Sequence, residues 1–150
     1  MKQTLASMGA PLLGVVSARH HPPELAILRG LELARRDGTV FRVLPLVLLR
    51  SEEELDWSAL IAAARDRKVA QELGLLASLA AKLAERPSLA LRVAELKGWR
   101  EPSVRYYPEV RSTFERKLAE ERSPGLARDW GFLVNVSEDS LRSTIQKHGV

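Results

Sequence analysis

Histidine and cysteine, the residues that most often carry metal or covalent chemistry, are scarce in this chain. It has three histidines and no cysteine, and the absence of cysteine excludes thiolate nucleophiles, disulfides and zinc–thiolate sites. His20 and His21 are adjacent, precede two prolines and lie near Glu24. Because metal ligands normally converge from different elements or from positions one helical turn apart, this pair is expected to be a solvated loop. We therefore expect no metal site and no cofactor.

A second candidate for chemistry is the segment RSTIQKH, in which Arg142 and His148 are separated by five residues. Such a pair suits cleavage of RNA without a metal, because an arginine can stabilise the charge of a phosphorane while a histidine transfers a proton. The alternative interpretation is structural. Arg142 is then a surface residue, and His148 favours the C-terminal end of a helix through its charge.

The spacing of Arg142 and His148 resembles the arginine–histidine signature of the HEPN ribonucleases, which are small all-α proteins. The resemblance implies a ribonuclease in which these two residues act together across a dimer. The chain departs from the family pattern at Ser143, where the family prefers Asn, Asp or His, and in the position of the motif at the C-terminal end. A metal-independent HEPN-like ribonuclease is therefore the enzymatic alternative to a non-enzymatic protein.

Aromatic and arginine residues concentrate in two short segments, and these residue types are the ones that hot spots of protein interfaces favour. They predict a partner-binding surface, and under that hypothesis Arg105→Ala or Tyr107→Ala abolishes partner binding without changing the melting temperature. The alternative is that the aromatic side chains seal the core where short helices meet. The candidate partner-binding residues are Trp99, Arg100, Arg105, Tyr106, Tyr107, Trp130 and Phe132.

The formal net charge of +4 is a weak indication of nucleic-acid binding. Its excess lies in residues 1–50, and no run of Lys or Arg is longer than two, whereas a dedicated phosphate-binding surface is usually more concentrated. The segment from Leu126 to His148 loosely resembles a helix-turn-helix, although Phe132 to Asn135 make the turn long and apolar. A helix-turn-helix DNA-binding regulator stays open, and nucleic acid is possible as a partner but not favoured.

The pattern along the chain predicts an all-α fold, a compact bundle of seven to eight mostly short helices. With 150 residues, 45% of them hydrophobic, the chain has the size of one globular domain over residues 1–150, in which residues 1–20 are loosely ordered. No apolar run is long enough for a membrane span, so we expect a cytoplasmic protein. Helices are expected over 23–36, 39–50, 57–68, 69–85, 88–97, 109–122, 126–134 and 138–147.

Three features define these helices locally. Asp56 and Ser137 are good N-caps for the helices that follow them. Pro108 is expected to start the helix over 109–122, in which Val110, Phe114 and Leu118 form one narrow apolar stripe. Residues 39–50 are ambiguous between a strand and a buried helix kinked at Pro45, and we interpret them as the helix.

Residues 56–83 and 123–148 are similar to small bacterial helical proteins encoded beside minimal nucleotidyltransferase genes in toxin–antitoxin-like modules. This resemblance implies a non-catalytic partner or antitoxin of a nucleotidyltransferase-type enzyme. It agrees with the lack of catalytic clusters in the sequence. The leading hypothesis is therefore a non-enzymatic interaction or regulatory protein that acts through a protein partner or its own homo-oligomer.

Overall fold

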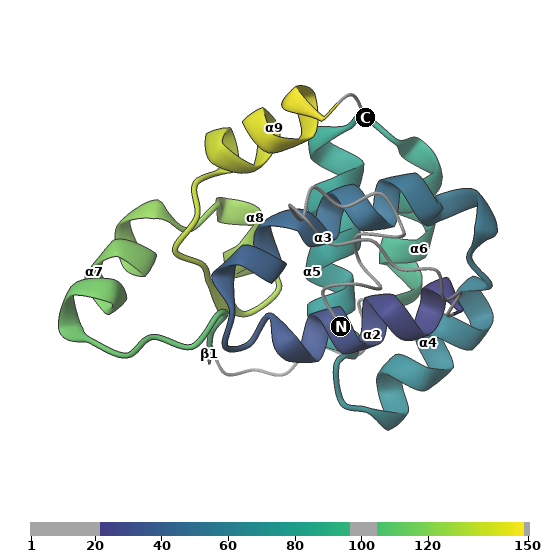
Figure 1. The fold of residues 1–150 in the computed structure, drawn as a ribbon, viewed down its shortest axis with the longest axis horizontal. Helices are drawn as coiled ribbons and strands as arrows, with labels where there is room; N and C mark the ends of the chain where they lie inside the picture. Colours follow the sequence, from purple (N-terminus) through teal and green to yellow (C-terminus); the bar gives the residue numbers. More distant parts are fainter. Residues whose placement is uncertain (1–21, 97–104, 149–150) are drawn as a thin grey trace, which may run out of the picture.

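The computed structural model describes residues 22–96 and 105–148. Within these residues it contains eight α-helices, one short 3-10 helix and a two-stranded parallel sheet (Figure 1), so the predicted all-α fold class is confirmed. His20, His21, Trp99 and Arg100 lie outside the described residues. The elements are α2 (Pro23–Leu33), α3 (Gly38–Ser51), η1 (Glu52–Glu54), α4 (Trp57–Asp66), α5 (Ala70–Leu83), α6 (Pro87–Leu96), β1 (Arg105–Tyr106), α7 (Thr113–Arg122), α8 (Gly125–Asp129), β2 (Phe132–Leu133) and α9 (Glu138–Lys147).

Helix α5 runs through the middle of the bundle (Figure 1), and all but two of its 14 residues are buried. It contacts α3, α4, α6, α8 and α9. Small residues permit this close packing. At Gly74, a Cβ atom would lie 2.2 Å from Cζ3 of Trp130, so the indole ring packs directly on the backbone of the helix.

Helix α3 settles the ambiguous segment. Residues 39–50 are helical, with Pro45 inside the helix and nine of the twelve residues buried, so the helix interpretation is confirmed. The side chain of Asp37 caps α3 by accepting hydrogen bonds from the amides of Thr39 and Val40. The preceding helix ends at Leu33 rather than at residue 36, because Asp37 belongs to the start of α3.

Two other predicted caps are confirmed. The carboxylate of Asp56 accepts a hydrogen bond from the amide of Ala59 at 3.1 Å, and the hydroxyl of Ser137 accepts one from the amide of Ser140 at 3.2 Å. Each side chain satisfies an amide that has no partner inside its helix. In the part of the chain that the structure describes, no helix is both long and apolar enough to span a bilayer.

The prediction of a helix over 126–134 is wrong beyond Asp129. Gly131 has a φ of 81°, a left-handed conformation that glycine adopts readily and that does not continue a helix. The following Phe132 and Leu133 form β2, which pairs with β1 in parallel. The amide of Tyr107 also donates to the carbonyl of Leu133 at 3.0 Å.

The prediction that Pro108 starts a helix is also wrong. The amide of Glu109 donates to the carbonyl of Arg35 at 2.7 Å, which joins this stretch of backbone to the turn that follows α2. Helix α7 begins only after Ser112, whose hydroxyl accepts a hydrogen bond from the amide of Glu115. A side-chain cap four residues further on therefore sets the start of the helix.

Residues 109–122, which we call the α7 arm, stand at one side of the molecule (left in Figure 1). Ala119 is the one buried residue of α7, and Phe114 is 69% exposed. Val110 precedes the helix. The predicted stripe of Val110, Phe114 and Leu118 therefore does not bury the arm against the bundle. The arm leaves a large aromatic side chain in solvent.

Candidate functional site

Two cavities flank the base of the α7 arm, and Glu109 and Val110 line both of them. We call them the Glu72 cavity, of about 570 Å³, and the Arg42 cavity, of about 680 Å³. The Glu72 cavity is lined by Arg35, Glu72, Arg105, Tyr106, Tyr107, Glu109, Val110, Arg116 and Phe132. The Arg42 cavity is lined by Arg36, Gly38, Thr39, Arg42, Val43, Pro108, Glu109, Val110, Arg111, Glu115, Asn135, Val136 and Thr144.

A buried carboxylate lies at the Glu72 cavity. The side chain of Glu72, on α5, is only 1% exposed. One of its oxygens, Oε2, accepts hydrogen bonds from Nε of Arg35 at 2.9 Å and from Nη2 at 2.5 Å. Arg105 approaches the other oxygen, Oε1, at 3.8 Å. A charge removed from water requires such partners, since its desolvation costs several kcal/mol.

Tyr107 joins this pair to the aromatic core. Its ring packs edge-on against Phe41 and in a tilted arrangement against Phe132, each with a centroid distance of 5.3 Å. Its hydroxyl donates to the carbonyl of Leu31 at 2.9 Å. Burial raises the pKa of Tyr107 well above its ordinary value, and the negative charge of Glu72 adds to the increase. The phenol is therefore a neutral hydrogen-bond donor at physiological pH.

Tyr106 has a more exposed position at the arm. Its hydroxyl donates to Glu120 of α7 at 2.9 Å, and the guanidinium of Arg116 lies over its ring at 5.8 Å. Desolvation and the hydrogen bond to Glu120 raise the pKa of Tyr106. These contacts link β1 to the arm through polar and cation–π interactions rather than through an apolar interface.

The structure brings four of the predicted partner-binding residues to one cavity, namely Arg105, Tyr106, Tyr107 and Phe132. Tyr107 and Phe132 are each 2% exposed and Trp130 is 3% exposed, so these three aromatics are core residues, as the alternative interpretation had it. Tyr107→Ala is accordingly expected to reduce stability, which corrects the expectation of an unchanged melting temperature. Arg105 and Tyr106 keep partial exposure, and their part in partner binding stays a prediction.

Arg142 and His148, the two residues of the ribonuclease alternative, have separate contacts in the structure. Arg142 forms ion pairs with Glu138 at 3.6 Å and Asp139 at 3.4 Å. His148 follows the end of α9, and its carbonyl accepts a hydrogen bond from Arg50 at 2.7 Å. Six positions separate Arg142 from His148, and in a helix of 3.6 residues per turn this spacing places the two side chains on faces roughly 120° apart. The resemblance implies a site formed across a dimer, which the geometry of one chain does not test, so the ribonuclease alternative stays a prediction.

The helix-turn-helix alternative also finds no support in the geometry. Helix α8 has five residues, and the strand β2 stands between it and α9. Residues 126–148 therefore form a helix–strand–helix segment, in which β2 is occupied by its pairing with β1. The turn that sequence showed to be long and apolar therefore contains a strand.

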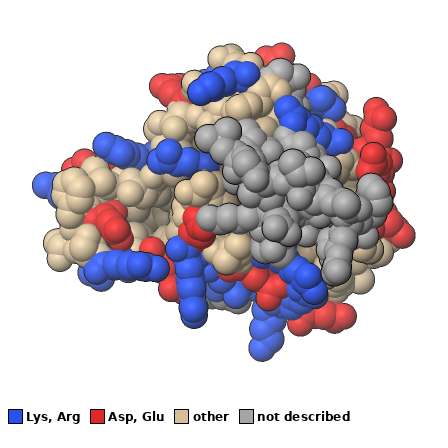
Figure 2. Space-filling view, viewed as in Figure 1, with Lys and Arg blue, Asp and Glu red and all other residues tan. Residues whose placement is uncertain are grey.

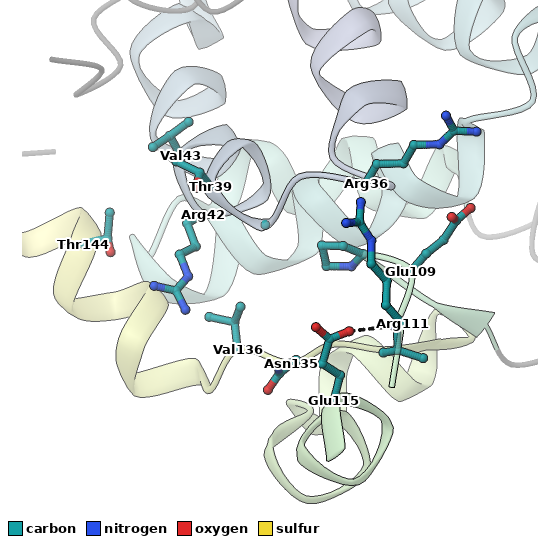
Figure 3. Close-up of a pocket in the computed structure, with 13 residues that line it drawn as sticks. Arg36, Thr39, Arg42, Val43, Glu109, Arg111, Glu115, Asn135, Val136 and Thr144 are labelled. Carbon is teal, nitrogen blue, oxygen red and sulfur yellow. Dashed lines mark hydrogen bonds between the residues drawn. The ribbon is translucent and has the colours of Figure 1, made fainter. Parts of the chain in front are cut away.

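The Arg42 cavity lies between α3, the arm and α9 (Figure 3). Arg42 extends from α3 toward Val136, while Arg111 extends in a different direction, toward Arg36 (Figure 3). Arg36, Arg42 and Arg111 form no side-chain hydrogen bond or ion pair with any described residue. This cavity therefore holds cationic groups that the fold itself does not neutralise.

Two further polar side chains at the Arg42 cavity differ in whether they have hydrogen-bond partners. Glu115 caps α7 in return, because its Oε2 accepts a hydrogen bond from the amide of Arg111 at 2.6 Å while its own amide donates to Ser112; this is close to a capping box. In contrast, Oδ1 of Asn135 is buried and accepts no hydrogen bond among the described residues.

Glu72 and Arg42 are not among the site residues predicted from the sequence. A signal for each exists, since Glu72 is a single carboxylate within the apolar run VAQELGLLASLA and Arg42 a single cation within TVFRVLPLVLL. A buried charge such as that of Glu72 usually has a partner, but the sequence does not name that partner, and it does not show that Arg42 is exposed. Among the described residues, no group of three or more His, Asp or Glu side chains is arranged to hold a metal ion.

Comparison of the chain with protein-family models, with curated proteins and with solved structures found no match.

Proposed function

We propose that this chain is a non-enzymatic helical interaction protein, antitoxin-like in its manner of action, which binds a cytoplasmic partner protein through the α7 arm. The observation that carries the proposal is the exposure of Phe114, at 69%, on a helix that buries only Ala119. Exposing an aromatic ring of this size forgoes about 2 kcal/mol of burial free energy. An apolar pocket on a partner recovers that free energy.

The arm also has the composition of an interface rim. Around Phe114, α7 carries the basic residues Arg116, Lys117 and Arg122 and the acidic residues Glu115, Glu120 and Glu121. Figure 2 shows positive and negative side chains interspersed over this side of the molecule. An apolar anchor surrounded by charges of both signs fits a protein surface better than the uniformly negative backbone of a nucleic acid.

A foreign partner is a better match to the arm than a second copy of this chain. A closed two-fold dimer pairs one surface patch with itself, whereas the two large exposed hydrophobic residues of the described chain are Leu91 on α6 and Phe114 on α7. These helices lie on opposite sides of the bundle (Figure 1). A contact of Phe114 with α6 of another copy would be head-to-tail, which forms a ring or an open chain rather than a two-fold dimer.

The test places a photo-crosslinking phenylalanine analogue at position 114 of the full chain, in the native host, with the same analogue at position 91 as the matched control. We expect position 114 to crosslink to one protein, and position 91 not to crosslink to it. From the resemblance to partners of minimal nucleotidyltransferases, we expect mass spectrometry to identify the crosslinked protein as a nucleotidyltransferase-type enzyme. Crosslinks only to a second copy of the chain, or equal crosslinking from both positions, would overturn the proposal.

The variant Phe114→Ser provides a second, independent test. Because the ring lies in solvent, this variant is expected to keep the wild-type melting temperature and to lose co-purification of the crosslinked partner by at least about tenfold, which corresponds to about 1.4 kcal/mol of binding free energy. Leu91→Ser, which removes an equally exposed apolar side chain from the other side, is expected to retain the partner.

A further inference from the structure

The Arg42 cavity has a ligand chemistry that partner binding by the arm does not use. Arg36, Arg42 and Arg111 come from three different segments, and none is neutralised by a described residue. Two carboxylates also line the cavity: Glu115, which is engaged in capping α7, and Glu109, which is exposed. The lining therefore keeps a net positive charge. Cations that gather without counter-charges favour an anionic ligand.

The residue type and the volume narrow the class of anion. Arginine presents a planar set of donors that matches phosphate oxygens in pairs, and a volume of about 680 Å³ is in the range of sites for small organic molecules. Asp37 already binds the first free amides of α3. The phosphate would therefore depend on the guanidinium groups and not on the end of this helix.

The remaining lining indicates an organic body attached to the phosphate. Val43, Pro108, Val110 and Val136 contribute apolar surface. Oδ1 of Asn135 is buried without a hydrogen-bond donor, and such an acceptor loses about 1–3 kcal/mol if it stays unpaired. A hydroxyl or amino group of a ligand would supply that donor.

We propose that the Arg42 cavity binds an organic phosphate of nucleotide size. Its phosphate lies between the exposed side chains of Arg42 and Arg111, which extend in different directions in the structure and turn toward the phosphate on binding, with Arg36 at the rim. A hydroxyl or amino group donates to Oδ1 of Asn135 once that buried amide turns into the cavity. The body of the ligand packs on Val43 and Val136. Glu109, Val110, Arg111 and Glu115 of the arm line the cavity, whereas Phe114, the anchor of the proposed partner contact, does not, so variants can test the two proposals separately.

The experiment measures binding by isothermal titration calorimetry and thermal shift in chloride buffer of low ionic strength. The probes are the mono- and diphosphates of adenosine, guanosine, cytidine and uridine, with inorganic phosphate and unphosphorylated adenosine beside them. We expect saturable binding and a raised melting temperature with at least one nucleotide, weaker binding of inorganic phosphate and none of adenosine. Absence of binding by every nucleotide overturns the proposal.

Variants locate the site. Arg42→Gln and Arg111→Gln are each expected to weaken nucleotide binding about tenfold or more, since each removes a charged hydrogen-bond donor. Lys117→Gln removes the same charge from the arm outside the cavity and is expected to bind as wild type. If Lys117→Gln weakened nucleotide binding equally, the binding would be general charge attraction, and the proposed site would be wrong.

Asn135→Ala tests the organic body of the ligand. It is expected to weaken the binding of the nucleotide while leaving that of inorganic phosphate unchanged. Inorganic phosphate binding as tightly as the nucleotides would overturn this part of the proposal. Phe114→Ser is expected to bind nucleotide normally. The experiments therefore distinguish a failure of the nucleotide proposal from a failure of the partner-binding proposal.

Discussion

At the scale of single residues, the ion pair of Arg35 with Glu72 is the contact with the largest predicted energetic consequence. Glu72 is 1% exposed and Arg35 is 35% exposed, so removal of the arginine leaves a buried carboxylate with the more distant Arg105. Loss of one partner of a buried pair costs about 3–5 kcal/mol. Because Arg35 is partly solvated, we expect Arg35→Gln to lower the free energy of unfolding by about 3 kcal/mol, the lower end of that range.

Urea denaturation measures this difference, and the chain offers a matched control. Arg67 pairs with Glu32 at 2.5 Å, with both side chains more than a third exposed, so Arg67→Gln is expected to cost under about 1 kcal/mol. Adding Glu72→Gln to Arg35→Gln is expected to restore part of the lost stability, because the uncompensated charge disappears. Similar losses from Arg35→Gln and Arg67→Gln would contradict the role assigned to burial.

At the scale of elements, the α7 arm and the bundle are expected to unfold locally at different free energies. The cap on α7 is Ser112 and the cap on α4 is Asp56; removal of such a cap typically costs about 1 kcal/mol. The arm buries little, so Ser112→Ala is expected to speed hydrogen exchange of the α7 amides with a nearly unchanged melting temperature.

Asp56→Ala is the comparison for that experiment. Helix α4 buries Trp57, Leu60, Ile61 and Ala64, so loss of its cap is expected to lower the melting temperature of the whole bundle. Hydrogen-exchange mass spectrometry reports the local effect and circular dichroism the global one. An equal fall in melting temperature for the two variants would show that α7 is an integral part of the core.

The elements that sequence predicts well are the ones whose signals are local. Asp56 and Ser137 each bind an amide three residues further on, and the apolar run of α3 is helical despite Pro45. The sheet was missed because each strand has two residues and pairs with a partner 27 positions away in the chain. Such pairing depends on tertiary contacts that no window of sequence contains.

In the candidate site too, local signals could be predicted from the sequence and tertiary contacts could not. Sequence selected Arg105, Tyr106, Tyr107 and Phe132, which the fold does bring to one cavity, because aromatic and basic residues stand out by type. It did not separate exposed from buried members of that set. The burial of Tyr107 depends on Leu31 and Phe41, which belong to other helices, and the partners of Glu72 lie 37 and 33 residues away.

At the scale of the whole molecule, Tyr107 couples the stability of the bundle to alkaline pH. It contacts α2 through Leu31, α3 through Phe41 and β2 through Phe132, and its folded-state pKa is raised well above 10.0 by burial. The unfolded chain loses the phenolic proton above about pH 10, whereas the folded chain retains it. Stability is therefore complete below pH 10 and falls as pH rises toward the folded-state pKa, by up to about 1.4 kcal/mol per pH unit.

Denaturant titrations between pH 8.5 and about 11.5, an interval that spans the ordinary tyrosine pKa, compare the wild type with Tyr107→Phe. At the lower pH the variant is expected to be less stable by about 1 kcal/mol, because the hydrogen bond to Leu31 is lost. That gap should narrow or reverse at the higher pH, since phenylalanine has no proton to lose. Lysines titrate in both proteins and cancel in the difference. A gap that stays constant over the whole range would mean that Tyr107 ionises equally in the folded and unfolded chains, which its burial among three elements argues against.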